Sequence, residues 1–188
     1  MHDALRTLRK RSASTQAFRR AADEVCGALM RRLRSTLRTR AVGGDRVVFV
    51  TVLRAGMAFV PHALKAFPAA RLGVAGLRRD EATAEASWYY EHLPKLTKRD
   101  TVVILDPMLA TGGSAMLTAR HVLAKGASKT MIYMVGVLAA PEGMAALATV
   151  IPKANIIVAA VDAGLDARKF IVPGLGDFGD RFCGYGHA

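Results

Sequence analysis

Residues 102–114 read VVILDPMLATGGS and connect a run of apolar residues to the start of a helix. The apolar run ends at Asp106, and a turn of small residues comes directly after it. A continuous apolar run indicates a strand that is buried on both faces. The backbone N–H groups of Thr111 to Ser114, next to the positive end of the helix, predict a binding site for a phosphate group.

Two glycines and two hydroxyl groups fit this interpretation. Gly112 and Gly113 let the main chain approach an anion where a Cβ would obstruct it. Thr111 and Ser114 add hydroxyl donors, and Asp106 stands where it can accept hydrogen bonds from sugar hydroxyls. The segment has neither the Gly-Lys-Ser/Thr of a P-loop nor a GxGxxG pattern. An ordinary strand–turn–helix, with Gly at the bend and Ser as helix cap, is the alternative.

Apolar runs of similar length recur on both sides of this segment. We expect strands at 47–53, 72–77, 101–106, 130–138 and 155–161, and helices at 57–66, 114–125 and 141–149. The alternation indicates βαβ crossovers, and therefore an α/β fold with a mainly parallel sheet flanked by helices. Ligands of such sheets bind beyond the carboxyl ends of the strands. Residues 78–98 form a long charged and aromatic connection, which we expect to be a functional lid or partly disordered.

The N-terminal region is strongly basic and helical in pattern. Residues 1–40 hold eleven basic and three acidic side chains, and the whole chain has a formal net charge of +12. Ser14 and Thr15 can cap a helix. Its apolar face is predicted from residues at three- and four-residue steps, namely Phe18, Ala22, Val25, Leu29 and Leu33. The arginines on the other face could form a solvated surface, a surface between subunits or a surface that binds RNA. A start that is rich in Arg and poor in acidic residues also faintly resembles an organellar transit peptide.

Composition bounds the remaining possibilities. The chain has 188 residues, which suits one domain that buries most of its apolar surface. Its sequence contains no apolar run long enough for a transmembrane helix and no secretory signal, so we expect no membrane partner. Cys26 and Cys183 stand far apart without metal-ligand spacing, which argues against a disulfide or zinc site and favours a reducing, cytoplasmic location.

Several segments resemble one enzyme family. Residues 106–114, DPMLATGGS, match the PRPP-binding signature of uracil phosphoribosyltransferases at all nine positions, where PRPP is 5-phosphoribosyl-1-diphosphate. Many other phosphoribosyltransferases have two acidic residues at the start of this motif. The Asp-Pro variant therefore narrows the resemblance to the enzymes that use uracil. LRAG at 53–56 is similar to the family's pyrophosphate-contacting turn, and FIVPGLGDFGDR at 170–181 to its uracil-binding loop. The stretches 76–81 and 89–94 resemble a flexible hood, and AAPEG at 139–143 is a further landmark.

The resemblance implies a type I phosphoribosyltransferase fold, with a hood formed by the C-terminal loop and the N-terminal region. Within one domain, 1–188, it implies a basic helical region (1–44), an α/β core (45–165) and a uracil-binding part (166–188). It implies the conversion of uracil and PRPP to UMP and pyrophosphate, with Mg²⁺ held through PRPP and not by a metal site of the protein. The residues expected to be catalytic are Asp106, Arg54 and Asp177.

The resemblance also implies two sets of binding residues. Those expected to bind PRPP are Arg54, Arg79, Asp106, Pro107, Met108, Leu109, Ala110, Thr111, Gly112, Gly113, Ser114 and Asp177. Those expected to bind uracil, mainly through backbone groups, are Ile171, Gly176, Asp177 and Phe178.

Three features depart from the family pattern. Thr51 replaces a usual proline, and 30–33 reads MRRL where a Tyr-Glu pair is usual. The interval 34–46 is too short for the β-hairpin arm that clasps a partner subunit in the family. A homodimer or higher homo-oligomer is still expected, with the mode of dimerisation open, and GTP remains open as an effector. The competing interpretation is a catalytically weak or inactive relative that binds RNA, although the basic segment has a single aromatic residue, Phe18, for base stacking.

Overall fold

The computed structural model of the protein describes residues 1–40, 42–79 and 86–185. A central sheet has the strand order β3-β2-β1-β4-β6-β5, and β7 also pairs with β6. The strands are β1 (Val47–Leu53), β2 (Arg71–Arg79), β3 (Ala86–His92), β4 (Thr101–Leu105), β5 (Met108–Leu109), β6 (Ile132–Ala139) and β7 (Ile156–Val161). All neighbouring strands of this sheet are parallel except β2 and β3. The predicted α/β fold with a mainly parallel sheet is therefore confirmed.

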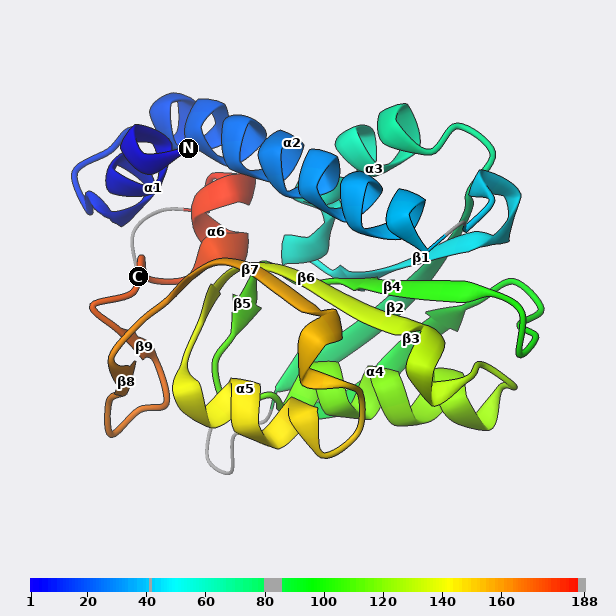
Figure 1. Ribbon diagram of the computed structural model, residues 1–188. Helices are drawn as coiled ribbons and strands as arrows, with labels where there is room; N and C mark the ends of the chain where they lie inside the picture. Colours follow the sequence, from blue (N-terminus) through cyan, green and yellow to red (C-terminus); the bar gives the residue numbers. More distant parts are fainter. Residues whose placement is uncertain (41, 80–85, 186–188) are drawn as a thin grey trace.

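Helices cover both faces of the sheet (Figure 1). One face carries α1 (His2–Arg9), α2 (Thr15–Thr39), α3 (Val60–Ala66) and α6 (Phe178–Cys183), and the other carries α4 (Gly113–Ala124) and α5 (Pro141–Ala148). Side chains of each strand alternate between the two layers. In β1, Phe49 packs in the layer with α2 and α3, whereas Val48 and Val50 pack in the layer with α4. This double burial explains the continuous apolar runs of the sequence.

The helix expected at 57–66 is divided into two parts. A 3₁₀ turn, η2 (Ala55–Phe59), precedes α3, which begins at Val60 with a proline in its first turn. Proline is tolerated at the start of a helix because its missing N–H would have no partner there.

The described part of the connection at 78–98 is ordered, contrary to the expectation of partial disorder, and its role as a lid stays a prediction. Residues Ala86–His92 form β3, which runs antiparallel to β2 at the edge of the sheet with a bulge between Gly76 and Leu77. The strand is held by α4, since the Trp88 ring lies 4.6 Å from that of His121, and Glu91 pairs with His121 (2.6 Å) and Lys125 (2.9 Å). Residues 80–85, within the resemblance to a flexible hood, lie outside the described part.

The N-terminal region forms two helices that pack on each other and on the sheet. Ser14 caps α2 by accepting a hydrogen bond from the Ala17 N–H at 3.2 Å. Every residue of the predicted apolar face is buried. That includes Phe18, so the one aromatic side chain of the basic segment is not available for base stacking. Between α2 and β1 the described residues contain only the short 3₁₀ turn η1 (Gly44–Arg46), in agreement with an interval too short for an arm.

Several basic side chains of this region are structural, which the expectation of a solvated or subunit surface did not foresee. Arg40 donates hydrogen bonds to the Tyr133 hydroxyl (2.5 Å) and to Asn155 (3.2 Å), and Arg19 donates to the Phe182 carbonyl (2.7 Å). Arg31, Arg34 and Arg38 instead lie on the outer face of α2, where they line a shallow groove with Ser35 and Thr39. Some arginines of this segment therefore hold elements together through hydrogen bonds, and others lie on the surface.

Two arginines fasten α1 to the C-terminal loop. Arg9 forms a bidentate ion pair with Asp162, at 2.5 and 2.7 Å, and also donates to the Gly174 carbonyl. Arg181 donates to the carbonyls of Leu8, Lys10 and Leu175 at 2.5–2.7 Å. Burial opposes the charged form of Asp162, but hydrogen bonds from Arg9 and the Gly174 N–H outweigh it and lower the pKa of this carboxyl. Helix α1 and the C-terminal loop are therefore held directly against each other.

No described helix has both the length and the apolar character needed to cross a bilayer. Cys26 and Cys183 are free thiols, and burial raises the pKa of Cys26 well above its usual range.

We predict that Arg9→Met destabilises the protein by about 2–4 kcal/mol at pH 7, somewhat less than the loss of one partner from a fully buried pair. The reason is that the Asp162 side chain, only 4% exposed, would lose its cation. Arg6→Met is the matched control, because Arg6 pairs with the exposed Asp3 in the same helix and should cost about 0–1 kcal/mol. Urea unfolding measures both free energies, and equal values would contradict the prediction.

The same pair predicts a pH dependence. Because the folded protein lowers the pKa of Asp162, the stabilisation is present above the unfolded pKa of about 3.9 and is lost as the pH falls through the folded value. The stability difference between wild type and Arg9→Met should therefore be constant near neutral pH and shrink below about pH 4. Urea unfolding of both proteins over a series of pH values measures it.

Candidate active site

The predicted phosphate site lies at the carboxyl edge of the sheet. Asp106 follows β4 directly, and its Oδ1 accepts a hydrogen bond from the Met108 N–H at 3.3 Å. The segment 110–114, which we call the phosphate turn, then leads into α4, whose N-cap is Gly112 with φ of 84°. Because α4 begins at Gly113, the N–H groups of its first turn have no acceptor within the helix. The Thr111 hydroxyl accepts from the Gly113 N–H at 3.3 Å, a long contact that a phosphate oxygen could replace.

The phosphate turn is fixed by direct contact with α5. A Cβ on Gly143 would lie 2.4 Å from the Ala110 carbonyl oxygen and 2.6 Å from that of Leu109. On the other side, the Pro107 carbonyl accepts from the N–H groups of Val137 and Leu138 at 2.8 and 3.0 Å. Only glycine permits this approach of α5, which gives a physical role to the AAPEG landmark in the sequence.

The turn after β1 approaches the same edge. A Cβ on Gly56 would lie 2.4 Å from the Leu105 carbonyl oxygen, so the LRAG turn lies against the end of β4, directly before Asp106. The Arg54 side chain is 49% exposed, and its Nη2 lies 2.7 Å from Asp180 Oδ1. Partial burial is the largest single influence and works against the charged form, but the hydrogen bond and charge of Asp180, together with smaller effects of Cys183 and Tyr185, outweigh it and raise the pKa of Arg54. Arg54 is thus a cation held by Asp180, in a turn that lies against the end of β4 directly before Asp106.

The predicted uracil loop folds back onto the LRAG turn. Ile171 lies in β9 (Ile171–Val172), which pairs with β8 (Gly164–Leu165). Gly174 and Gly176 have φ of 60° and 80°, which only glycine adopts readily. Asp177 caps α6 by accepting from the Asp180 N–H at 2.7 Å. A Cβ on Gly179 would lie 3.7 Å from that of Ala55, so α6 and the LRAG turn are in contact.

Phe178 contributes to packing and leaves only its backbone to the site. Its ring is buried and lies 5.2 Å from that of Phe18 in α2 and 5.9 Å from that of Phe182. This arrangement agrees with the expectation that Phe178 acts through backbone groups.

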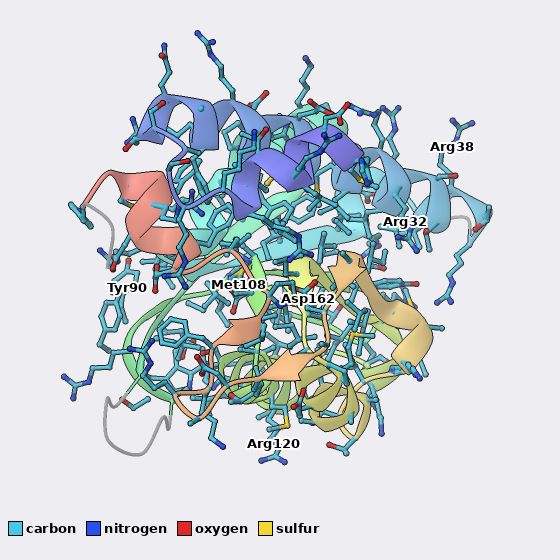
Figure 2. The ribbon with its side chains drawn as sticks, turned by 90° about the vertical axis from the view of Figure 1, so that its left-hand side faces the viewer. Arg32, Arg38, Tyr90, Met108, Arg120 and Asp162 are labelled. Atoms are coloured by element: carbon cyan, nitrogen blue, oxygen red, sulfur yellow. The ribbon has the colours of Figure 1, made fainter. Side chains whose placement is uncertain are left out.

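Figure 2 looks onto this edge, with Met108 and Asp162 near its centre and Tyr90 at the side. The LRAG turn contacts both the end of β4, directly before Asp106, and the start of α6, directly after Asp177. Arg79 is the last residue of β2, opposite Ala86, but its side chain lies outside the described part. Within the described residues, no group of three or more His, Cys, Asp or Glu side chains could hold a metal ion.

Four residues around the site were not among the predicted site residues: Asp162, Asp180, Arg181 and Tyr185. Asp180 and Arg181 do lie in the predicted uracil-binding loop, 170–181, but no role was expected for their side chains. Asp162 accepts from the Gly174 N–H at 2.8 Å and so supports the loop. Asp180 and Tyr185 contact Arg54. The spacing of Asp177 and Asp180, followed by Gly184, is a readable signal for a short capped helix. The partners of these residues are far away in sequence, and no local pattern indicates them.

Comparison with known proteins agrees with this geometry. The family profile described as uracil phosphoribosyltransferase matches residues 2–184. The uracil phosphoribosyltransferase of Geobacillus kaustophilus is 37% identical over 94% of this chain and 90% of its own, and that of Delftia acidovorans 36% over 96% and 92%. Among solved structures, the AQ2163 protein of Aquifex aeolicus is 33% identical with a TM-score of 0.86, over 96% of this chain and 92% of its own. A purine phosphoribosyltransferase from Pyrococcus horikoshii (18% identity, TM-score 0.57, 76% and 83% covered) shares the fold.

We predict that Gly143→Ala destabilises the protein by about 1–3 kcal/mol, because the added methyl group would overlap the Leu109 and Ala110 carbonyls. Gly44→Ala is the matched control, since a Cβ there meets nothing within 4 Å. It should change stability by no more than about 0.5 kcal/mol. Thermal and urea unfolding of the two variants measure the difference, and a Gly143→Ala protein as stable as wild type would refute the close packing.

Proposed function

The chain belongs to the uracil phosphoribosyltransferase family, and we propose that it transfers the 5-phosphoribosyl group of PRPP to N1 of uracil, forming UMP and pyrophosphate. The observation that carries this proposal is the position of DPMLATGGS (106–114) at the carboxyl edge of the sheet, beside Arg54 and the glycine-rich loop. We propose that the whole chain, 1–188, works as one phosphoribosyltransferase domain.

The reaction places positive charge on the ribose ring while pyrophosphate leaves with negative charge. The protein therefore has to stabilise the leaving group, hold the sugar and direct uracil N1 to the anomeric carbon. Arg54 suits the leaving group, because its planar guanidinium matches phosphate oxygens and its raised pKa keeps it charged. Arg79 is the second candidate cation. Asp106, at the end of β4, orients the ribose hydroxyls.

The 5′-phosphate of PRPP would bind at the phosphate turn. N–H groups of the first turn of α4 and the hydroxyls of Thr111 and Ser114 donate to its oxygens. The other PRPP-binding residues of this segment, 107–109, connect Asp106 to the turn and hold it against β6 through the Pro107 and Leu109 carbonyls. The cradle is thus built before the ligand arrives, which lowers the cost of ordering it.

Uracil presents an acceptor, a donor and an acceptor along one edge: O2, N3–H and O4. Backbone groups of Ile171, Gly176 and Phe178 can read this edge without a charged side chain. Cytosine would leave a buried polar group unpaired, at a cost of about 1–3 kcal/mol per group. The buried Phe178 ring and the Asp162 contact to Gly174 keep the loop in place.

Mg²⁺ is proposed to enter with PRPP, bound mainly by oxygens of the diphosphate and ribose. Carboxylates are ligands that this ion accepts, and Asp106 and Asp177 are the carboxylates that we propose could contact it. The ion would neutralise charge on the leaving pyrophosphate.

A homo-oligomer, a cytoplasmic location and control by GTP remain predictions. Light scattering at several protein concentrations tests the first, and assays with added GTP test the last.

The proposed activity predicts pyrophosphate release from PRPP and Mg²⁺ in the presence of uracil. Cytosine, hypoxanthine and adenine serve as competing bases, and cytosine should react at least about fivefold more slowly, since one unpaired group costs about 1–3 kcal/mol. A chelator should stop the reaction, and excess Mg²⁺ should restore it. Faster turnover with a purine would refute the assignment of the base.

Asp106→Asn should lower UMP synthesis by about tenfold to a hundredfold, because hydrogen bonds from the ribose to a charged acceptor would be weakened. Asp45→Asn, an exposed change in η1, is the control and should leave the rate unchanged. A folded Asp106→Asn protein with normal activity would exclude the proposed role of this residue.

A further inference from the structure

Arg54 has two partners from the C-terminal end of the chain that the reaction itself does not explain. Its Nη2 lies 2.7 Å from Asp180 Oδ1, and its guanidinium carbon lies 5.1 Å from the centre of the Tyr185 ring. The Asp180 side chain is 30% exposed and that of Arg54 49%, so the pair borders solvent. Exposed ion pairs contribute little to stability. The contact therefore points to the placement of Arg54 more than to the stability of the fold.

The position of Asp180 is fixed by the contacts of α6. It lies in α6, and its N–H is bound by the Asp177 side chain at 2.7 Å. The helix is anchored on one side by the buried Phe178 ring and on another by Arg181, which holds three backbone carbonyls. An isolated helix of six residues would not be stable. These tertiary contacts therefore fix where the Asp180 carboxylate lies.

The end of the same helix places Tyr185. Gly184 adopts φ of 84°, a conformation that glycine tolerates, and turns the chain at the helix C-cap. The Asp180 carbonyl then accepts from the N–H groups of Gly184 and Tyr185 at 2.8 and 3.0 Å. This turn puts the aromatic ring within cation–π range of the Arg54 guanidinium.

The geometry leaves Arg54 able to bind an anion. Asp180 contacts one of the three guanidinium nitrogens, so the ion pair does not occupy the whole planar fork. A carboxylate and an aromatic ring together define the plane of a guanidinium, which fixes the direction of its remaining donors. An arginine held in this way loses less side-chain freedom when a ligand arrives.

We propose that Asp180 and Tyr185 are positioning residues that hold the Arg54 guanidinium toward the diphosphate of PRPP. The inference rests on the proposed function, in which Arg54 binds this group. Asp180 does not touch the substrate in this arrangement and acts only through Arg54.

A double-mutant cycle in the full-length protein tests the inference. Arg54→Ala, Asp180→Asn and the double variant are compared with wild type by kcat/KM for PRPP, by KM for uracil and by the inhibition constant of inorganic pyrophosphate. Asp180→Asn should raise the KM for PRPP and the inhibition constant of pyrophosphate about tenfold, because small misplacements of a binding group have large effects. The KM for uracil and the melting temperature should not change. In the Arg54→Ala background, Asp180→Asn should have no further effect.

Each other outcome has a distinct meaning. Normal activity of Arg54→Ala would remove the proposed role of Arg54 and with it the proposed diphosphate site. An impaired Arg54→Ala together with a wild-type Asp180→Asn would overturn the positioning role alone. Equal losses from Asp180→Asn in both backgrounds would show that Asp180 acts independently of Arg54. A lower KM for PRPP in Asp180→Asn would show that the carboxylate competes with the substrate, which also overturns the inference.

Tyr185 gives an independent arm of the test. Tyr185→Phe keeps the ring and should stay within about threefold of wild type in the KM for PRPP, whereas Tyr185→Ala should approach the defect of Asp180→Asn. Asp45→Asn is the matched control for the loss of a carboxylate. Equal behaviour of the Phe and Ala variants would exclude a role for the ring.

Discussion

The active edge of this protein depends on main chains that approach each other more closely than any side chain would allow. Gly56 brings the LRAG turn against the end of β4, and Gly143 brings α5 against the carbonyls of Leu109 and Ala110. A parallel sheet gathers strand ends at one edge, but it does not fix the loops that extend from them. The glycine contacts do so, and they fix the turn whose N–H groups are proposed to bind a phosphate.

The second half of the site is held from outside the sheet. The C-terminal loop has little regular structure, and α6 alone is too short to be stable. Arg9 and Arg181 connect this loop to α1, and Phe178 connects it to Phe18 of α2. Arg9 and Arg181 thus do not serve as a solvated surface. They support the C-terminal loop through hydrogen bonds, where regular secondary structure is scarce. The N-terminal helices are therefore part of the site, although none of their residues is proposed to touch a substrate.

Local patterns in the sequence predicted the strands and the phosphate turn but not the contacts between distant segments. Continuous apolar runs located the parallel strands, Ser14 located the start of α2, and the small residues after Asp106 located the turn that precedes α4, whose binding of a phosphate stays a prediction. The segment Ala86–His92 was missed, because an exposed edge strand with one half-buried Trp88 has no regular alternation of apolar and polar residues. The pairs Arg9–Asp162 and Arg54–Asp180 join residues 153 and 126 positions apart, and no local property of either partner indicates the other.

These long-range pairs share one physical logic. A cation that is proposed to bind a diphosphate has to remain charged, partly exposed and correctly oriented before the ligand arrives. A fully buried arginine would be well placed but inaccessible, and a fully solvated one would have to be ordered at each turnover. The pair with Asp180 lies between these extremes, since burial opposes the charge of Arg54 while the carboxylate restores it. Asp180 lies in α6, and Arg181 holds α6 to the end of α1 through the Leu8 and Lys10 carbonyls. The orientation of the Arg54 guanidinium is therefore set in part by packing between α6 and α1.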